Sequence, residues 1–323
     1  MTGAVIRVGL AGLGRHGSRY ARHIADGDVP GLALTTVWRR DAAALGEQAR
    51  AWRARAAPSL EALIESPEVD AVITVLPAAL NPTVGARICA AGKPMLIEKP
   101  LAPGAADVEQ LARTSAAAGV MLTVGQTLRF DPLIAALRDA YADIGRLRGF
   151  CFEQRLENRG LAWEDRAAEA GGGVTLQSAV HALDTLLFIT AAADAEVVAA
   201  GMSRINYREL EDEVSALLRL RLDDQPPVLG SVHGSKTGRT RRTCFTLYGS
   251  DGEAQADLVA RTLTQHGPAG PRITDIPAAP SIVGLLGAWR AALTGAAPNP
   301  VPPDQALRTH RLIDALYRAA GSR

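Results

Sequence analysis

The stretch Gly12-Leu13-Gly14-Arg15-His16-Gly17 follows a short apolar run, residues 5–11, and precedes a segment with helical periodicity. Its GxGxxG spacing permits a tight turn, a close approach of the backbone to a pyrophosphate, and close packing of a helix on a strand. The helix N-terminus that follows favours negative charge. We therefore expect these six residues to bind a dinucleotide; a glycine-rich turn without a ligand is the alternative.

The residues around this stretch predict the domain that contains it. Short β-branched runs alternate with alanine-rich helical stretches up to residue 126, which is typical of βαβ units on a parallel sheet. Two helices, 84–91 and 107–118, should end at Gly92 and Gly119. We predict a Rossmann domain over residues 1–126, with strands at 6–11, 32–38, 71–76, 94–98 and 120–124.

From residue 127 to residue 323 the pattern changes to a helix at 132–141 followed by strands at 217–222, 228–234 and 243–248, with turn residues between them. Such runs favour hairpins, so we expect an α+β domain with a predominantly antiparallel open sheet for substrate binding and oligomerisation. Residues 265–280 are rich in Gly and Pro and are interpreted as an irregular surface loop. A helix should close the chain at 303–320. The fold class is α/β.

The composition of the chain limits the classes of binding partner that we expect. With 35 basic and 34 acidic side chains the formal charge is +1, so no overall field attracts nucleic acid or membrane, and we expect a small-molecule substrate. Apolar residues make up 47% and charged residues 21%, as in ordinary folded proteins. The three cysteines are far apart and lack CxxC spacing, which predicts neither a metal site nor a disulfide framework. Without an evident signal peptide, the expected location is cytoplasmic.

The end of the second predicted strand bears on the choice of cofactor. An NAD-type domain usually has an acidic residue there to bind the adenine ribose hydroxyls, whereas this chain has Trp38-Arg39-Arg40-Asp41. A guanidinium at Arg39, with Arg40 beside it, suits a 2′-phosphate better than bare hydroxyls. The sequence thus predicts NADP as the preferred cofactor over NAD. The alternative is that Asp41 binds the ribose.

Residues that follow the next two strands should lie near the nicotinamide, because ligands of open α/β sheets bind beyond the carboxyl ends of the strands. The first of these strands continues into Leu76, Pro77 and Asn81, and the second ends at Glu98 and Lys99. All five are therefore candidate cofactor-binding residues.

Several short motifs together resemble one family. Glu98-Lys99-Pro100 follows a strand, Gly92-Lys93-Pro94 precedes it, Arg129-Phe130-Asp131-Pro132 stands at the domain junction, and Gly171-Gly172-Gly173 leads to His181 and Asp184. The chain resembles the glucose-fructose oxidoreductase, inositol dehydrogenase and rhizopine catabolism family, Gfo/Idh/MocA, over essentially its whole length. The resemblance is specific for family and carries little information on substrate.

The resemblance implies roles for individual residues. The lysine of Glu-Lys-Pro, Lys99, is expected to donate or accept the proton of the hydroxyl whose carbon exchanges hydride with the nicotinamide, with Glu98 orienting it. The Lys99–Pro100 peptide is expected to be cis. His181 is the second catalytic candidate.

The remaining candidates are substrate-binding residues: Gln177, Arg129 and Asp184. Gln177 stands where relatives commonly have an aspartate, and an amide can bind a hydroxyl but cannot accept its proton. Asp184 is expected either to position the helix or to contact the substrate.

The resulting hypothesis is an NAD(P)-dependent dehydrogenase or reductase of a secondary alcohol or ketone on a sugar, cyclitol or related polyol, assembled as a homodimer or homotetramer. Two alternatives remain at this point. One is a glycosidase or lyase that recycles its nicotinamide, and the other is a cofactor-binding regulator without catalysis; the Gln177 replacement keeps the last open.

Overall fold

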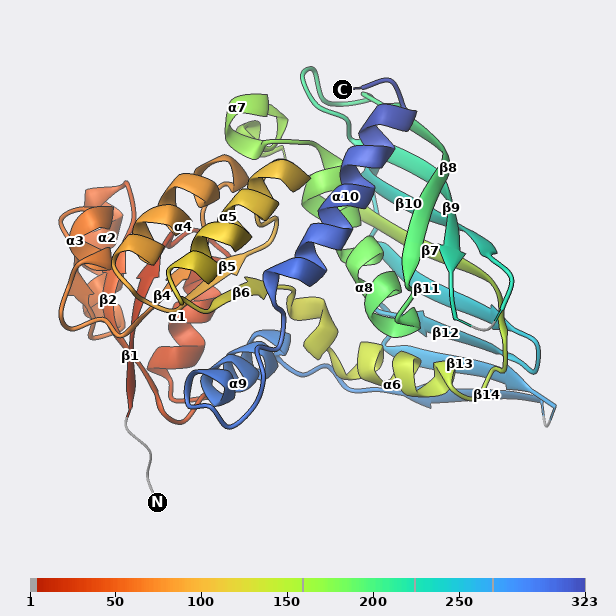
Figure 1. Cartoon of the computed structure of the whole chain (residues 1–323), viewed down its shortest axis with the longest axis horizontal. Helices are drawn as coiled ribbons and strands as arrows, with labels where there is room; N and C mark the ends of the chain where they lie inside the picture. The colour runs from red at the N-terminus through yellow and green to blue at the C-terminus, as the bar shows by residue number, and fades with distance from the viewer. Residues whose placement is uncertain (1–4, 159, 224, 269, 323) are drawn as a thin grey trace. The chain divides into compact units, whose positions relative to one another are not determined.

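The computed structural model describes residues 5–158, 160–223, 225–268 and 270–322, and the chain forms two compact units (Figure 1). The first unit comprises residues up to 102 together with 106–127 and 282–307, and the second comprises 103–105, 128–281 and 308–323. The chain leaves the first unit close to the boundary predicted after residue 126. Residues 282–307, which sequence alone placed in the second domain, pack with the first unit.

The first unit is built on a six-stranded parallel sheet in the order β3-β2-β1-β4-β5-β6. This is the Rossmann strand order, in which the chain reverses direction across the sheet between β1 and β4. The strands are β1 (Ile6–Ala11), β2 (Leu32–Trp38), β3 (Arg55–Ala56), β4 (Ala71–Thr74), β5 (Met95–Glu98) and β6 (Leu122–Gly125). Only the two-residue β3 has no counterpart among the predicted strands.

Helices connect these strands, and two of them end as the glycine pattern predicted. Gly92 and Gly119 follow α4 and α5 with φ of 66° and 64°, a left-handed conformation that glycine adopts without steric cost. The helices that contribute to this unit are α1 (Gly17–Ala25), α2 (Ala42–Ala51), α3 (Leu60–Ile64), α4 (Asn81–Ala90), α5 (Ala105–Ala117) and α9 (Ser281–Leu293).

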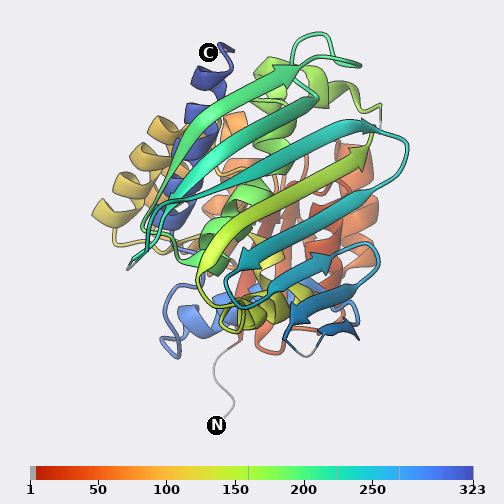
Figure 2. The ribbon, with the colours of Figure 1, turned by 90° about the vertical axis from the view of Figure 1, so that its right-hand side faces the viewer.

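The second unit is built on an eight-stranded sheet in the order β14-β13-β12-β11-β7-β10-β9-β8, seen in Figure 2 as a broad layer of neighbouring strands. Every neighbouring pair is antiparallel except β7 and β10, which run parallel. The prediction of a predominantly antiparallel sheet is therefore confirmed. The strands are β7 (Leu147–Glu157), β8 (Asp194–Ser203), β9 (Glu213–Arg221), β10 (Val228–Gly238), β11 (Arg242–Gly249), β12 (Glu253–Asp257), β13 (Thr262–Gly267) and β14 (Gly270–Asp275).

One face of this sheet carries the core of the unit. Along β9, Val214, Ala216, Leu218 and Leu220 are buried, while the residues between them are more exposed. This period of two is expected of a sheet with one covered face. Apolar residues of three helices complete the core. The helices of the unit are α6 (Pro132–Tyr141), α7 (Ala167–Ala170), α8 (Val180–Thr190) and the main part of α10 (Pro303–Ala319).

The interpretation of residues 265–280 as an irregular loop was wrong for 265–267, which belong to β13, and for 270–275, which form β14. The two strands pair as an antiparallel hairpin closed by Gly267 and Gly270. The turn explains the glycines, and Pro271 is tolerated because β14 is an edge strand with one unpaired side. Gly and Pro therefore marked the end of a hairpin and the edge of the sheet.

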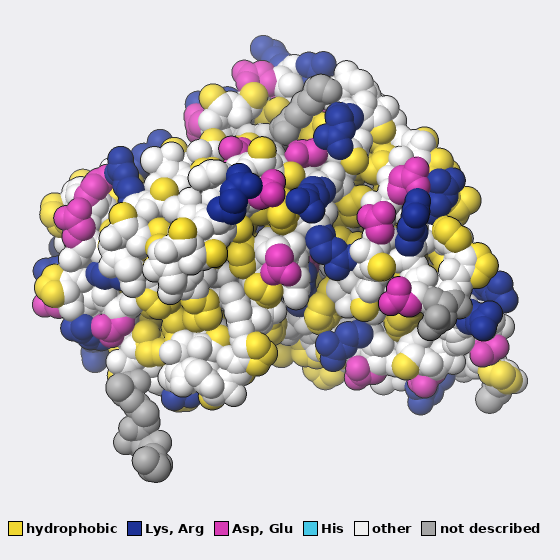
Figure 3. All heavy atoms as spheres, in the orientation of Figure 1, with side chains coloured by type: hydrophobic (Ala, Val, Ile, Leu, Met, Phe, Trp, Pro, Cys, Tyr) yellow, Lys and Arg dark blue, Asp and Glu magenta, His cyan; other side chains and the backbone are white. Residues whose placement is uncertain are grey.

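Basic and acidic side chains are interspersed on the face of the molecule seen in Figure 3, in keeping with the near-zero net charge. Across the residues that the structure describes, no helix is both long enough and apolar enough to cross a membrane.

Candidate functional site

The glycine-rich turn lies at the reversal point of the first sheet, directly after β1. Gly12 has φ of 98°, and a Cβ there would overlap the carbonyl oxygen of Val75, which follows β4. A Cβ at Gly17 would overlap the carbonyl oxygen of Gly12 itself. Two of the three glycines are thus required by close backbone contacts within the turn.

The middle glycine has a different environment. Gly14 is exposed, and a Cβ added there would meet no atom within 4 Å. Arg15, next to it, is also exposed. The open space over Gly14, at the turn that leads into α1, is what a pyrophosphate needs in order to approach the backbone. The turn therefore fits the dinucleotide that the sequence predicted, and a Cβ at Gly14 would enter that space.

Arg39 is held beside this turn. Its Nη1 donates to Gln48 Oε1 at 3.0 Å and to the carbonyl oxygen of Leu13 at 3.4 Å. Asp41 instead caps α2, since its Oδ1 accepts a hydrogen bond from the backbone N–H of Ala44 at 3.1 Å. Arg40 is exposed. The residue nearest the turn at the end of β2 is accordingly basic.

Glu98, the last residue of β5, is tied to the glycine-rich turn by a side chain of the turn. Its Oε1 accepts a hydrogen bond from the Tyr20 hydroxyl at 2.9 Å and lies 2.6 Å from His16 Nε2. Burial, followed by the adjacent Glu98 carboxylate, raises the pKa of Tyr20 well above its usual value, so the phenol stays a donor. The sequence suggested no side-chain role for His16, because a single histidine within GxGxxG has no distinguishing pattern.

Other candidates gather at the same edge of the sheet. The Lys99–Pro100 peptide is cis, as predicted, and Asn81 Nδ2 donates to the carbonyl oxygen of Pro100 at 3.1 Å. Leu76 and Pro77 follow β4. Within the described part of the chain, Asn81 Oδ1 and Glu98 Oε2 are buried acceptors without a hydrogen-bond donor. Acceptors of this kind fit a polar cofactor at this edge.

In the second unit, Gln177 lies within a π-helical turn, Thr175–Ala179, that leads into α8. Its Nε2 donates to the carbonyl oxygens of Gly172 at 2.8 Å and Glu164 at 3.0 Å, and its Oε1 accepts from Lys236 Nζ. The amide is thus hydrogen-bonded to three groups of the protein, and its expected contact with substrate stays a prediction. His181 is partly buried at the start of α8.

Lys236 and its neighbours were not found from the sequence. The Lys236 ammonium lies 3.1 Å from Glu164 Oε2, which also accepts a hydrogen bond from the Tyr207 hydroxyl at 2.9 Å. Burial, and then the Glu164 carboxylate, raise the pKa of Tyr207. The three residues come from separate segments with no common spacing, so only the fold brings them together.

Arg129 and Asp184, two predicted substrate-binding residues, bind each other. The guanidinium donates to both carboxylate oxygens at 2.7 Å, and the two side chains are only 5% and 2% exposed. The Arg129 guanidinium also stacks over the Phe188 ring at 5.0 Å. Of the two roles expected for Asp184, the structure favours positioning the helix.

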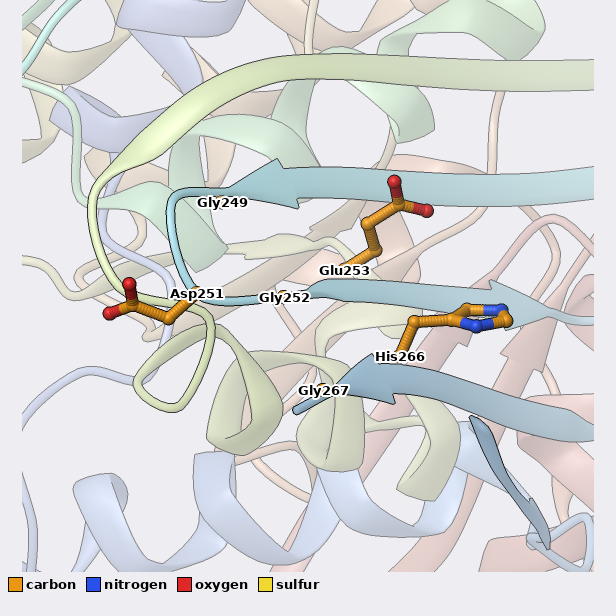
Figure 4. Close-up of a pocket in the computed structure, with 6 residues that line it drawn as sticks. All are labelled: Gly249, Asp251, Gly252, Glu253, His266 and Gly267. Atoms are coloured by element: carbon orange, nitrogen blue, oxygen red, sulfur yellow. The ribbon is translucent and has the colours of Figure 1, made fainter. Parts of the chain in front are cut away.

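Two pockets of the molecule differ in whether predicted site residues line them. One of about 350 Å³ lies at the β11–β12 hairpin, with Gly249 and Asp251 at one end and Glu253 and His266 at the other (Figure 4). None of the predicted site residues lines it. A second, of about 470 Å³, is lined in part by Trp38, Arg39 and Arg40 in the first unit. Among the described residues, no cluster of His, Cys, Asp or Glu suits a metal ion.

Family comparison accounts for both units. The model of the GFO_IDH_MocA oxidoreductase family with NAD-binding Rossmann fold matches residues 6–126, and that of the GFO/IDH/MocA C-terminal domain matches residues 136–255. The chain belongs to the Gfo/Idh/MocA family. The family is one of oxidoreductases, and the first unit of this chain is an NAD-binding Rossmann domain.

Among sequence relatives, 1,5-anhydro-D-fructose reductase from Ensifer adhaerens is 33% identical over 217 residues, 66% of this chain and 63% of that protein. In that alignment the chain spans less than two thirds of its relative. UDP-N-acetylglucosamine 3-dehydrogenase from Acidithiobacillus ferrooxidans is 27% identical over 259 residues, 80% of this chain and 76% of that one.

Solved structures share the fold of the whole chain. A structure of the Acidithiobacillus ferrooxidans dehydrogenase superimposes with a TM-score of 0.84 at 23% identity and covers 98% of each chain. A 3-ketoreductase from Actinomadura kijaniata in complex with NADP and TDP-benzene gives a TM-score of 0.86 at 21% identity over 97% of each chain.

Proposed function

We propose that this oxidoreductase transfers hydride between NADP(H) and a secondary alcohol or ketone on a sugar, cyclitol or related polyol. The contact that carries the proposal is the 2.6 Å link between His16 of the glycine-rich turn and Glu98, the neighbour of Lys99. It ties the dinucleotide-binding turn to the strand end that presents the lysine. Sequence relatives named as sugar and inositol oxidoreductases support the substrate class.

In this proposal the nicotinamide supplies or accepts the hydride, and the chain handles the proton. Oxidation of a carbinol releases a proton from its oxygen as hydride leaves its carbon, and Lys99 accepts that proton; in reduction Lys99 returns it. Glu98 orients the strand end. His181 is the second catalytic residue of the proposal, and Gln177, Arg129 and Asp184 hold the helix that carries it.

A test of this assignment measures net NADPH consumption with a panel of keto-sugars and the reverse reaction with polyols. Lys99→Ala should lower kcat at least about 100-fold, the lower range of a general acid–base contribution, with cofactor Kd near wild type. Lys93→Ala is the matched control, because Lys93 donates to the Ser66 carbonyl at 2.6 Å and has no place in the proposed chemistry. Unchanged turnover in Lys99→Ala would contradict the assignment.

The same panel separates the alternatives. A nicotinamide-recycling glycosidase or lyase would release product without net change in NADPH absorbance, and a regulator would bind cofactor without turnover of any compound.

The preference for NADP(H) is proposed from the surroundings of Arg39. The guanidinium lies beside the glycine-rich turn and lines a pocket of about 470 Å³, whereas Asp41 is engaged in capping α2. A charge-assisted bond contributes about 1.5–3 kcal/mol, so NADP(H) should bind at least about tenfold more tightly than NAD(H). Arg39→Asp should reverse or abolish this ratio in paired titrations, and Arg113→Asp on the exposed face of α5 should not. Equal or tighter wild-type binding of NAD(H) would show that Arg39 does not select the phosphate.

The cytoplasmic location and assembly as a homodimer or homotetramer remain predictions. Light scattering on the purified full chain measures the oligomer directly, and a monomer at micromolar concentration would contradict the assembly.

A further inference from the structure

A chain of buried polar groups in the second unit joins the 3₁₀ turn Ala162–Asp165 to β10 and to the π-helical turn. Glu164 and Lys236 lie 3.1 Å apart with side chains that are 8% and 7% exposed, and Lys236 also donates to Gln177. Removing two charges from water costs several kcal/mol per ion, and an apolar pair of similar size often stabilises a fold equally well. Stability alone therefore gives no reason for this pair.

Lysine is rare in this chain, which makes its buried position more informative. Of the 35 basic side chains only Lys93, Lys99 and Lys236 are lysine. All the others are arginine. An ammonium is a compact charge with three donors, whereas a guanidinium is a wide planar fork. Lys236 lies between Glu164 and Gln177, where a compact cation can donate hydrogen bonds in several directions.

The contacts of Gln177 explain what the cation does there. Both N–H groups of its amide are directed to protein carbonyl oxygens, of Gly172 and Glu164, so its oxygen faces Lys236. A carboxylate has no N–H groups and could not make the first two bonds. Lys236 and the main chain of Glu164 therefore determine the orientation of this amide from opposite sides.

The amide in turn holds an uncommon piece of backbone. π-Helical turns are rare, cost backbone hydrogen bonding and occur frequently at functional sites. Gln177 is at the centre of this one, and Glu211 Oε1 accepts the N–H of Thr175 at its start at 3.1 Å. His181 follows as the second residue of α8. The position of His181 thus depends on a turn held by the side chains of Lys236 and Glu211 and by the main chain of Glu164.

The segment that supplies Glu164 is itself fixed. Asp165 accepts hydrogen bonds from the backbone N–H groups of Arg208, Glu209 and Leu210 at 2.8, 3.0 and 3.1 Å, and Tyr207 donates to Glu164. The carboxylate of Glu164 is consequently presented to Lys236 by a turn that is itself held by hydrogen bonds.

We propose that Glu164 and Lys236 are positioning residues of the site. They hold Gln177 and the π-helical turn in place and so set the position of His181. The inference rests on the proposed function only for what His181 then does; the positioning itself is a property of the second unit.

The experiment compares Lys236→Met, Glu164→Gln and the double variant with Lys93→Met in the full chain. The first readout is the imidazole NMR signals of His181 in histidine-labelled protein, assigned among the six histidines with His181→Asn. We expect these signals to move in all three site variants and to stay unchanged in Lys93→Met. This readout needs no substrate, so it remains decisive even if the wild type turns over nothing and the proposed function fails.

The second readout is turnover of any substrate that the wild type accepts. Each single variant should lower kcat at least tenfold with NADPH Kd within twofold of wild type. The double variant removes both charges of the pair, so its thermal stability should recover relative to the single variants while kcat stays low and the His181 signals stay shifted. Wild-type His181 signals, or a kcat that recovers together with stability in the double variant, would overturn the proposal. Since the double variant should fold even where a single one does not, the test can be completed.

Discussion

The two glycine-rich turns of this molecule look alike in sequence and differ in what surrounds them. At Gly14 the space where a side chain would lie is open to solvent. At Gly172 a Cβ would crowd the Tyr317 hydroxyl, and at Gly173 it would overlap the carbonyl oxygen of Glu211. One turn leaves room for a ligand, and the other leaves room for polar groups of the protein itself. Glycine spacing therefore indicates a close approach without saying which partner approaches.

The difference separates binding from stability. A side chain added at Gly14, which has no protein atom within reach, should impair only cofactor binding. A side chain added in the second turn should impair only folding and the geometry of the second unit. Three glycine substitutions test this separation, and a fourth substitution tests the segment that carries Glu164.

Gly17→Ala should have the largest effect, because the new Cβ overlaps the carbonyl oxygen of Gly12 and backbone cannot move aside as a flexible side chain can. Overpacking of this kind costs about 1–3 kcal/mol, and the distorted turn should also weaken NADPH binding at least about 100-fold. Fluorescence titration and urea unfolding measure the two effects. Wild-type affinity would contradict the role of this turn.

Gly173→Ala should lower the free energy of unfolding by about 1–3 kcal/mol for the same steric reason, since its Cβ overlaps Glu211. NADPH Kd should stay within twofold of wild type, because the turn belongs to the second unit. A large loss of cofactor affinity in folded Gly173→Ala protein would remove the distinction between the two turns.

Gly14→Ala should leave urea unfolding within about 0.5 kcal/mol of wild type, as expected for an exposed position with no contact to lose. Cofactor binding should weaken about tenfold, because the methyl group occupies the space that the pyrophosphate needs. Isothermal titration with NADPH measures this. Unchanged affinity would place the pyrophosphate elsewhere.

Asp165→Asn should give the smallest change, confined to a range of pH. Burial opposes ionisation of Asp165, but the N–H groups of residues 208–210 and the charge of Arg208 outweigh it and lower its pKa. A lowered pKa stabilises the fold above the unfolded value of about 3.9, and this stabilisation is lost as pH falls through the folded pKa. The Tm difference from wild type should be full at pH 6 and shrink as the pH falls below about 3.9. Asp139→Asn, on an exposed side chain, is the control.

Much of the fold follows from local patterns. The strands at Ile6–Ala11 and Leu32–Trp38 and the helix at Pro132–Tyr141 begin and end at the residues predicted, because period, β-branching and glycine or proline punctuation agree there. The hairpin at residues 262–275 was missed because its glycines and proline are also loop residues. Their assignment to strands becomes visible only in the pairing of β13 with β12 and β14.

The candidate site divides in the same way. The sequence by itself predicted the dinucleotide turn, the Glu98-Lys99-Pro100 strand end and the basic residue at position 39 as parts of the site, because each of these motifs consists of residues adjacent in the chain. Tertiary structure alone decided that His16 bridges to Glu98 and that Lys236 meets Glu164 and Gln177. These contacts join residues 59 to 82 positions apart. No local period records such a contact, since it exists only after strands and turns from distant parts of the chain have packed together.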